Sequence, residues 1–204
     1  MWNGTENQIT LVLIRHGETK SNVQHRYLGK GDEDLIQEAC SRLEKDREKR
    51  RFLKVDEVYC SPMKRCLKTA KILYPEMEIN VIDQFREMDF GDFEGKNYLD
   101  LRSDIRYQRW IDSNGTLPFP GGESRKEFVH RTIEGFLHMV ENIQSGRLEI
   151  NKIALVVHGG TIMALLSHYH GGNYFDYRIP NGEGYVCTLL GKEQMRITDL
   201  KRIP

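Results

Sequence analysis

The chain has 204 residues, of which 39% are hydrophobic and 29% are charged. This composition excludes a disordered chain, and the length suits one domain that buries about 70% of the surface exposed on unfolding. The 30 lysines and arginines balance the 30 aspartates and glutamates, so the formal net charge is zero. That balance argues against a nucleic-acid-binding surface, which needs excess positive charge, but leaves room for a small basic pocket.

The apolar run at 9–14 is too short to span a membrane, which takes about 20 residues. We find no basic leader followed by a cleavage pattern. None of the four cysteines belongs to a C-x-x-C pair, so neither a zinc knuckle nor a redox motif is indicated: Cys40, Cys60, Cys66 and Cys187. We therefore expect a cytoplasmic protein with reduced thiols and no membrane partner.

Strand and helix patterns alternate along the chain. Strands are predicted at 8–14, 56–60, 78–82, 152–157, 185–190 and 195–200, and the first and fourth are continuous apolar runs typical of strands buried on both faces. Helices are predicted over 33–50, from 61 to near 73, over 98–110, from 124 onward and over 160–168. The alternation predicts a single α/β domain over residues 1–204, a three-layer sandwich with a mainly parallel central sheet.

Several helices carry local signals. Ser61 is the expected N-cap of its helix, with Pro62 at the first position, while Ser124 and Glu127 form a capping box. Apolar residues after Ser124 recur at spacings of four and three, which predicts a core-facing stripe of Val129, Ile133, Phe136, Val140 and Ile143. The charged run at 44–51 could be a nucleic-acid patch, but its mixed signs favour a solvated helix face.

Cationic and histidine side chains follow three predicted strands. Arg15 and His16 follow the first, Arg65 lies just after the second, and His158 follows the fourth. Ligands bind outside the carboxyl ends of parallel strands, so these segments can converge on one pocket. Two arginines and two histidines suit a phosphate, and glycines beside both histidines let backbone N–H groups approach it. Each histidine alone could equally be a satisfied core residue.

Arg65 is predicted to lie in the first turn of its helix. The helix dipole disfavours a cation there by about 0.3–1 kcal/mol. An anion between the arginine and the free N–H groups of the turn would explain the position. The alternative is an arginine that swings out to solvent.

Breaking a phosphomonoester also requires a group that protonates the leaving oxygen. Glu87 is the best candidate, because burial among its apolar neighbours would raise its pKa, while Asp89 and Asp92 compete with it on sequence alone. No acidic cluster for magnesium accompanies these residues, and His168 and His170 lack the spacing of metal ligands. A histidine nucleophile needs no metal, so we expect neither a metal nor a cofactor.

Five blocks of the sequence resemble the histidine phosphatase superfamily, in the branch of phosphoglycerate mutases and related phosphatases. They occur in the family's order at 13–19 (continuing through Asn22 and Arg26), 61–70, 86–95, 120–124 and 157–160. One R-H-G triplet would be a weak signal, whereas five ordered blocks are specific. The resemblance implies a phosphoglycerate mutase-like fold.

The resemblance also implies a role for each matched residue. His16 would be the nucleophile that forms a phosphohistidine, and Glu87 would protonate the leaving oxygen and then activate water. Arg15, Arg65 and His158 would hold the phosphoryl oxygens and stabilise the transition state. Further contacts to the phosphate or substrate are expected from Asn22, the Gly159 N–H, Thr19, Arg26 and Tyr27.

Mutases and phosphatases of this kind share these residues and differ in whether a second substrate hydroxyl or water takes the phosphoryl group. The segment after Gly95 lacks the long insertion that tends to close the mutase site, which favours a metal-independent phosphomonoesterase acting on a small phosphorylated metabolite. The loop at 27–35 is similar to one in α-ribazole-5′-phosphate phosphatases of cobalamin assembly, although 37–39 lacks a glycine that relatives often have. The alternatives are a broad-specificity metabolite phosphatase, a phosphoglycerate mutase and a phosphate-binding module without turnover.

The predicted helix at 98–110 offers two further groups. Its arginines would share one face, either as a solvated basic face or as a site for a second phosphate or carboxylate: Arg102, Arg106 and Arg109. Its aromatic residues could stack on a base such as benzimidazole or pack in the core or at its rim: Tyr98, Tyr107 and Trp110. We expect a monomer or a homodimer.

Overall fold

The computed structural model describes residues 8–49, 52–145, 150–191 and 194–203. Within these ranges a six-stranded sheet has the order β3-β2-β4-β1-β5-β6. Its strands are β1 (Gln8–Arg15), β2 (Glu57–Cys60), β3 (Ile79–Val81), β4 (Lys152–Val157), β5 (Gly184–Leu190) and β6 (Arg196–Ile203). The pairs β1/β4, β2/β4 and β2/β3 are parallel, whereas β5 and β6 add an antiparallel edge. The predicted, mainly parallel sheet is confirmed.

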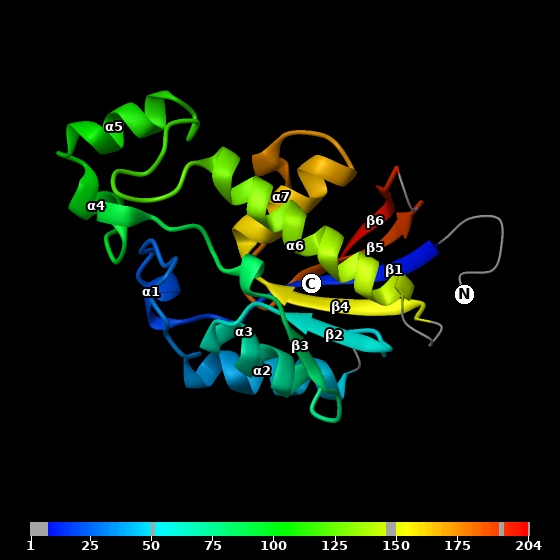
Figure 1. Ribbon diagram of the computed structural model, residues 1–204. Helices are drawn as coiled ribbons and strands as arrows, with labels where there is room; N and C mark the ends of the chain where they lie inside the picture. The colour runs from blue at the N-terminus through cyan, green and yellow to red at the C-terminus, as the bar shows by residue number, and fades with distance from the viewer. Residues whose placement is uncertain (1–7, 50–51, 146–149, 192–193, 204) are drawn as a thin grey trace.

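Helices cover both faces of this sheet (Figure 1). One face carries α2 (Gln37–Glu48) and α3 (Lys64–Leu73), and the other carries α6 (Arg125–Ser145) and α7 (Gly159–Tyr169). Side chains of β1 alternate between the two layers, because successive strand residues point to opposite faces. Leu11 and Leu13 join the core under α6 and α7, whereas Val12 and Ile14 join the core over α2 and α3. This alternation explains the continuous apolar run and confirms the three-layer sandwich.

A cap formed by residues 98–119 lies beyond the carboxyl ends of the parallel strands, together with α1 (Lys20–Val23) (Figure 1). The cap contains α4 (Tyr98–Leu101) and α5 (Ile105–Asp112), and the short 3-10 turns are η1 (Asp83–Phe85), η2 (Gly91–Phe93) and η3 (Tyr174–Tyr177). An aromatic cluster holds the cap in place. Trp110 lies 4.7 Å from Phe119, and Tyr27 lies 5.9 Å from Phe119, between ring centroids.

The prediction of one helix over 98–110 is wrong. Two helices stand there, because Asp104 begins the second by accepting a hydrogen bond from the Arg106 N–H at 2.9 Å. Arg102 follows α4, so the three arginines do not share one helix face. Arg106 pairs with Asp92 at 2.7 Å and with Asp104 at 2.8 Å, and these two carboxylates offset its charge.

The prediction of Ser61 as an N-cap is also wrong. Helix α3 begins at Lys64, and Met63 occupies the cap position without a side-chain hydrogen bond. The Ser61 hydroxyl forms a hydrogen bond with His158 Nε2 at 2.8 Å instead of capping the helix. Arg65 nonetheless remains in the first turn of the helix, as predicted.

The signals in α6 are largely confirmed. The Glu127 carboxylate accepts from the Ser124 N–H at 2.8 Å, and the Ser124 hydroxyl accepts from the Glu127 N–H at 3.2 Å, as a capping box requires. The later residues of the predicted stripe are buried in the core: Phe136, Val140 and Ile143. Val129 and Ile133 are only half-buried.

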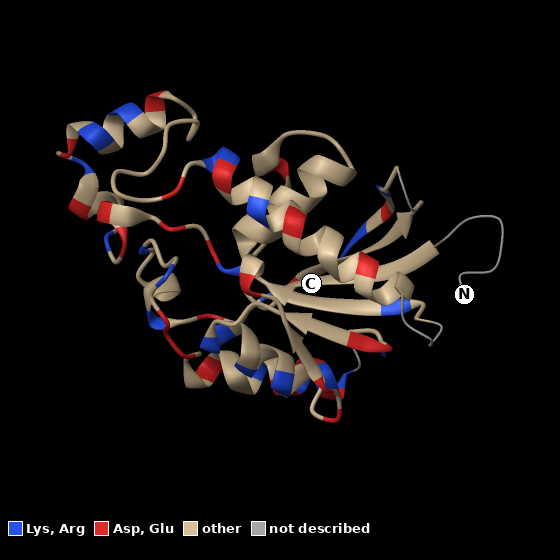
Figure 2. Ribbon diagram, viewed as in Figure 1, with Lys and Arg blue, Asp and Glu red and all other residues tan. Residues whose placement is uncertain are grey.

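Charged residues lie mainly on helices and loops, and both signs alternate along α2 (Figure 2). Residues 50 and 51 of the predicted charged run lie outside the described residues, and Leu43 and Asp46 of α2 are buried. In the described ranges, no helix has the length and apolar character needed to cross a membrane. All four cysteines are buried and free.

Candidate active site

His16 lies immediately after β1 and is 3% exposed. Its Nδ1 lies 2.7 Å from the Gly17 carbonyl oxygen. A carbonyl only accepts, so the ring proton is assigned to Nδ1 and the lone pair to Nε2. Burial, together with the positive charges of Arg65 and Arg15, holds the pKa of His16 well below 6.5. The ring is therefore neutral at pH 7, with Nε2 available as a nucleophile.

His158 follows β4 and is fully buried. Its ring centroid lies 5.2 Å from that of His16, and the two planes are inclined at 69°. The Ser61 hydroxyl lies 2.8 Å from His158 Nε2. Burial and the charge of Arg65 hold the pKa of His158 well below 6.5. The two parallel strands thus bring both predicted histidines together, and Ser61 orients the second ring.

Two arginines lie close enough to His16 to lower its pKa. Arg65 is fully buried and donates to the Gly31 and Gly29 carbonyl oxygens at 2.7 and 2.9 Å, so it does not swing out to solvent. Arg15 donates to the Ile179 carbonyl oxygen at 2.7 Å. The Nε atoms of both arginines are buried without a hydrogen-bond partner in the described part of the chain. Buried donors left unpaired in this way suit an anionic ligand.

Glu87 lies between η1 and η2, in a segment without regular structure. Its carboxyl oxygens accept from the N–H groups of Met88 at 2.9 Å and Gly160 at 3.4 Å. Burial raises the pKa of Glu87, although the Met88 hydrogen bond opposes that rise. Its two competitors are engaged elsewhere: Asp89 pairs with Lys30 at 3.1 Å, and Asp92 pairs with an arginine of α5. Glu87 is therefore the carboxyl best suited to donate a proton.

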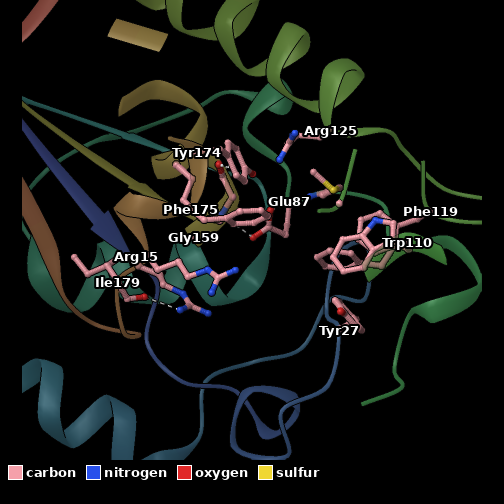
Figure 3. A pocket seen from close by; sticks show the side chains of 16 residues that line it. Arg15, Tyr27, Glu87, Trp110, Phe119, Arg125, Gly159, Tyr174, Phe175 and Ile179 are labelled. Carbon is pink, nitrogen blue, oxygen red and sulfur yellow. Dashed lines mark hydrogen bonds between the residues drawn. The ribbon is translucent and has the colours of Figure 1, made fainter. Parts of the chain in front are cut away.

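One cavity of about 370 Å³ joins Arg15 and Glu87 to the cap, whereas His16, Arg65 and His158 lie outside its lining (Figure 3). Arg15, Glu87, Gly159 and Gly160 line it, and Figure 3 shows Arg15 at one end and the aromatic residues of the cap at the other. The aromatic residues lining it are Tyr27, Phe90, Trp110, Phe119, Tyr174 and Phe175. Of the predicted aromatic set, Trp110 reaches the cavity, whereas Tyr98 is 60% exposed on the outside of the cap.

Two further arginines in the cavity wall were not predicted. Arg125 lies 5.5 Å from the Tyr174 ring, and Arg178 lies 4.5 Å above the Phe175 ring. Neither forms an ion pair with a carboxylate of the described residues. No spacing in the sequence relates them to the phosphate motifs, because the fold alone brings the start of α6 and the end of η3 to this wall.

The remaining predicted residues divide into two groups. Tyr27 and Gly159 line the cavity. Thr19 is fully buried and caps α1, where its hydroxyl accepts from the Asn22 N–H at 3.3 Å. Arg26 donates to Asp100 at 2.8 Å and so ties the loop after α1 to the cap, away from the cavity lining. For these residues, substrate contact stays a prediction.

Asn181 is a residue that the sequence analysis missed. Its side-chain N–H groups donate to the His16 carbonyl oxygen and to Asn22 Oδ1, both at 3.1 Å. The side chain is nearly buried, and Arg42 of α2 holds its carbonyl oxygen. Pairing of β5 with β1 brings this distant loop to His16. Among the described residues, no group of three or more His, Cys, Asp or Glu is placed to hold a metal ion.

The family model of the histidine phosphatase superfamily (branch 1) matches residues 11–195. The chain belongs to this family. It is 30% identical over 165 residues to the uncharacterized phosphatase PhoE of Bacillus subtilis, covering 80% of this chain and 78% of that protein. It is also 30% identical over 176 residues to a 2,3-bisphosphoglycerate-dependent phosphoglycerate mutase of Bartonella henselae, covering 80% and 82%.

Solved structures give the same fold. The alpha-ribazole phosphatase from Shigella flexneri matches with a TM-score of 0.77 at 24% identity, covering 93% of this chain and 95% of that chain. A mycobacterial glucosyl-3-phosphoglycerate phosphatase matches with a TM-score of 0.75 at 23% identity, covering 94% and 96%. The predicted phosphoglycerate mutase-like fold is confirmed. Within its family, the chain is a phosphoric monoester hydrolase, as predicted.

Proposed function

We propose that this chain hydrolyses a phosphomonoester through a phosphohistidine on His16, with Glu87 as the proton donor and without a metal ion. The observation that carries the proposal is the pairing of two opposite pKa shifts in one site. His16 is kept neutral with its Nε2 lone pair free, while Glu87 is kept protonated to a higher pH than an exposed glutamate. Such a pair suits nucleophilic attack coupled to general acid catalysis.

In the first step, His16 Nε2 attacks phosphorus as the P–O bond to the leaving group breaks, and Glu87 gives its proton to the departing oxygen. Arg15, Arg65 and His158 stabilise the charge that develops on the phosphoryl oxygens. In the second step, water attacks phosphorus and gives a proton to the Glu87 carboxylate. The P–N bond breaks, its electron pair returns to His16 Nε2, and inorganic phosphate leaves.

The cavity favours a substrate with a flat, apolar group attached to its phosphate. Its volume of about 370 Å³ is within the range of small-molecule sites, and aromatic rings form much of its wall. Guanidinium groups beside Phe175 and Tyr174 add planar surfaces and hydrogen-bond donors. We therefore propose α-ribazole 5′-phosphate, a sugar phosphate carrying an aromatic base, as the candidate substrate.

The first test is phosphate release from a panel of esters with EDTA present. The panel contains α-ribazole 5′-phosphate, 3-phosphoglycerate, fructose bisphosphates, nucleotides and p-nitrophenyl phosphate. We expect turnover without metal and a kcat/KM for α-ribazole 5′-phosphate well above the rest. Similar slow rates on every ester would indicate a generalist, and exchange of phosphoglycerates without phosphate release would indicate a mutase.

A Trp110→Ala variant tests whether the aromatic wall of the cavity determines this substrate specificity. Loss of one stacked ring is expected to raise KM for α-ribazole 5′-phosphate by about 5–150-fold, from a stacking energy of about 1–3 kcal/mol. The KM for a small ester such as glycerol phosphate should stay close to that of the wild type. Equal KM changes for both esters would contradict an aromatic subsite.

Gly160→Ala should lower activity through Glu87. A Cβ at position 160 would lie 2.3 Å from Glu87 Oε1, so the carboxyl must move. Displacing a reacting group by about 1 Å can cost about 10²-fold, and we expect a loss of about that size in kcat/KM for an alkyl phosphate. Thermal unfolding is the control, because the same Cβ would also lie 3.0 Å from Phe128. Wild-type rates would mean that Glu87 does not act from this position.

A further inference from the structure

The segment that carries Glu87 is held by one arginine of α6. Arg131 Nη1 donates to the carbonyl oxygens of Gln84 and Arg86, each at 2.8 Å. Its Nη2 donates to the carbonyl oxygen of Glu87 itself at 3.0 Å. Its remaining N–H groups meet the Glu123 carboxylate in a fork, at 2.6 Å from Nε and 2.8 Å from Nη2. All five guanidinium donors are thus used, three of them on the backbone of 84–87.

Glu123 fastens the other end of the same segment. Its Oε2 accepts from the Asp89 N–H at 3.1 Å, and its own N–H donates to the Asp89 carbonyl oxygen at 2.9 Å. The side chains of Glu123 and Arg131 are only 18% and 26% exposed, so salt screens this ion pair less than a surface pair. The guanidinium also lies 4.8 Å from the ring of Phe128, which is fully buried. Glu123 and Phe128 therefore hold the Arg131 guanidinium in the orientation from which it binds the backbone of 84–87.

This attachment matters because Glu87 itself lies in no helix or strand. Residues 86–90 lie between two short 3-10 turns and form no regular secondary structure. The carboxyl must nevertheless stay within hydrogen-bond reach of the leaving oxygen to act as an acid. Its two hydrogen bonds to Met88 and Gly160 N–H groups both depend on where the backbone runs. The side chains of Arg131 and Glu123 supply the support that secondary structure does not.

We propose that Arg131, locked by Glu123, is a positioning residue that sets the general acid Glu87 for proton donation. Arg131 does not line the cavity, so it acts through the backbone of 84–87 rather than on the substrate. The inference rests on the proposed role of Glu87. A lysine cannot replace this arginine, because an ammonium group offers three donors from one point and cannot form the planar fork.

The test compares two esters in the Arg131→Lys variant of the full chain. An alkyl phosphate needs a proton donor because its alkoxide is a strong base, whereas 2,4-dinitrophenyl phosphate releases a weakly basic phenolate without one. We expect kcat/KM to fall about 10²-fold for the alkyl ester, as for a misplaced catalytic group, and to change little for the dinitrophenyl ester. Lys126→Met, an exposed residue on the same helix, is the matched control and should match the wild type on both esters.

Equal losses on both esters would show a merely structural role and overturn the proposal, as would wild-type rates on both. Glu87→Gln provides the benchmark in the same assay. If Glu87→Gln itself does not discriminate between the esters, the proposed role of Glu87 as the general acid is wrong. If only Arg131→Lys fails to discriminate, the positioning role of Arg131 alone is wrong. Should Arg131→Lys not fold, Glu123→Gln decides the matter, since it frees the guanidinium and should slow the alkyl ester selectively. Equal effects of Glu123→Gln on both esters would overturn the proposal.

Discussion

Replacing His16 with alanine (His16→Ala) is expected to abolish turnover, lowering kcat by about 10⁴-fold or more, because it removes the atom that accepts the phosphoryl group. The site that remains keeps the buried Arg65 and the partly buried Arg15, so inorganic phosphate should still bind. Retained binding without turnover would separate the loss of a nucleophile from the loss of the fold. The measurement is phosphate release from the best ester of the panel, together with phosphate affinity by calorimetry.

Trapping of the covalent intermediate tests the same prediction more directly. Wild-type enzyme mixed with labelled ester and quenched in alkali should carry up to one phosphoryl group per chain, since phosphohistidine survives alkali but not acid. His16→Ala should carry none. His130→Ala is the matched control, because this histidine is exposed on α6, 69% by side-chain area, and should leave both readouts unchanged. Residual turnover by His16→Ala near the wild-type rate would mean that water attacks the ester directly.

The places of the candidate catalytic residues could be predicted from the sequence because the rule that gives them is local. A buried parallel strand fixes where its carboxyl end lies. Arg15 is the last residue of β1, and His16 and His158 directly follow β1 and β4. Arg65 required only one more step, a helix that starts near the end of β2. The anion expected beside Arg65 stays a prediction, which rests on the disfavoured position of a cation in a first helical turn.

Residues that support the site could not be predicted, because their contacts join segments far apart in the chain. Asn181 reaches His16 only through the pairing of β5 with β1. Arg131 reaches the backbone at 84–87 only because α6 packs beside η1. Ser61 carried a misleading signal, since a serine before a helix usually caps it, but here a buried histidine takes the hydroxyl. Local patterns decide propensity, while tertiary contacts decide which partner each polar group finally has.

The cap also combines features that the sequence predicts with features that only tertiary contacts decide. The aromatic character of 98–119 was evident, but which rings face the cavity depends on the break at Asp104, which divides one predicted helix into two. That break turns Trp110 toward Phe119 and the cavity and leaves Arg106 in surface ion pairs. Arg125 and Arg178, from other elements, also line this cavity. The candidate histidines thus lie where strands end, whereas the side chains of the cavity wall are placed by the packing of loops and helices.

Glu87→Gln is the second change with a large expected effect. Glutamine keeps the shape, but its one carbonyl oxygen replaces only one of the two oxygens that now accept from Met88 and Gly160, and it has no acidic proton to give. General acid catalysis contributes about 10²–10⁴-fold, and we expect a loss of that size in kcat/KM for an alkyl phosphate. For 2,4-dinitrophenyl phosphate kcat/KM should barely change, yet kcat should fall, because the second step still needs Glu87 to accept a proton from water. A burst of dinitrophenol equal to the enzyme concentration, followed by slow turnover, would identify that blocked step.

The pH dependence tests whether the acid is Glu87 in the protonated form. Burial raises its pKa, so in the wild type kcat/KM for the alkyl ester should fall as pH rises through that value, where the proton is lost. The second phosphate ionisation of each ester is measured separately and divided out of its kcat/KM profile before the ratio is taken, because the nitro groups give the dinitrophenyl ester the lower pKa. Because the pKa of His16 is held well below 6.5, its protonation should add no acid limb near that pH. In Glu87→Gln the ratio of the two esters should become independent of pH. A ratio that still falls with pH in this variant would assign the proton to another residue, and the competing aspartates would return as candidates.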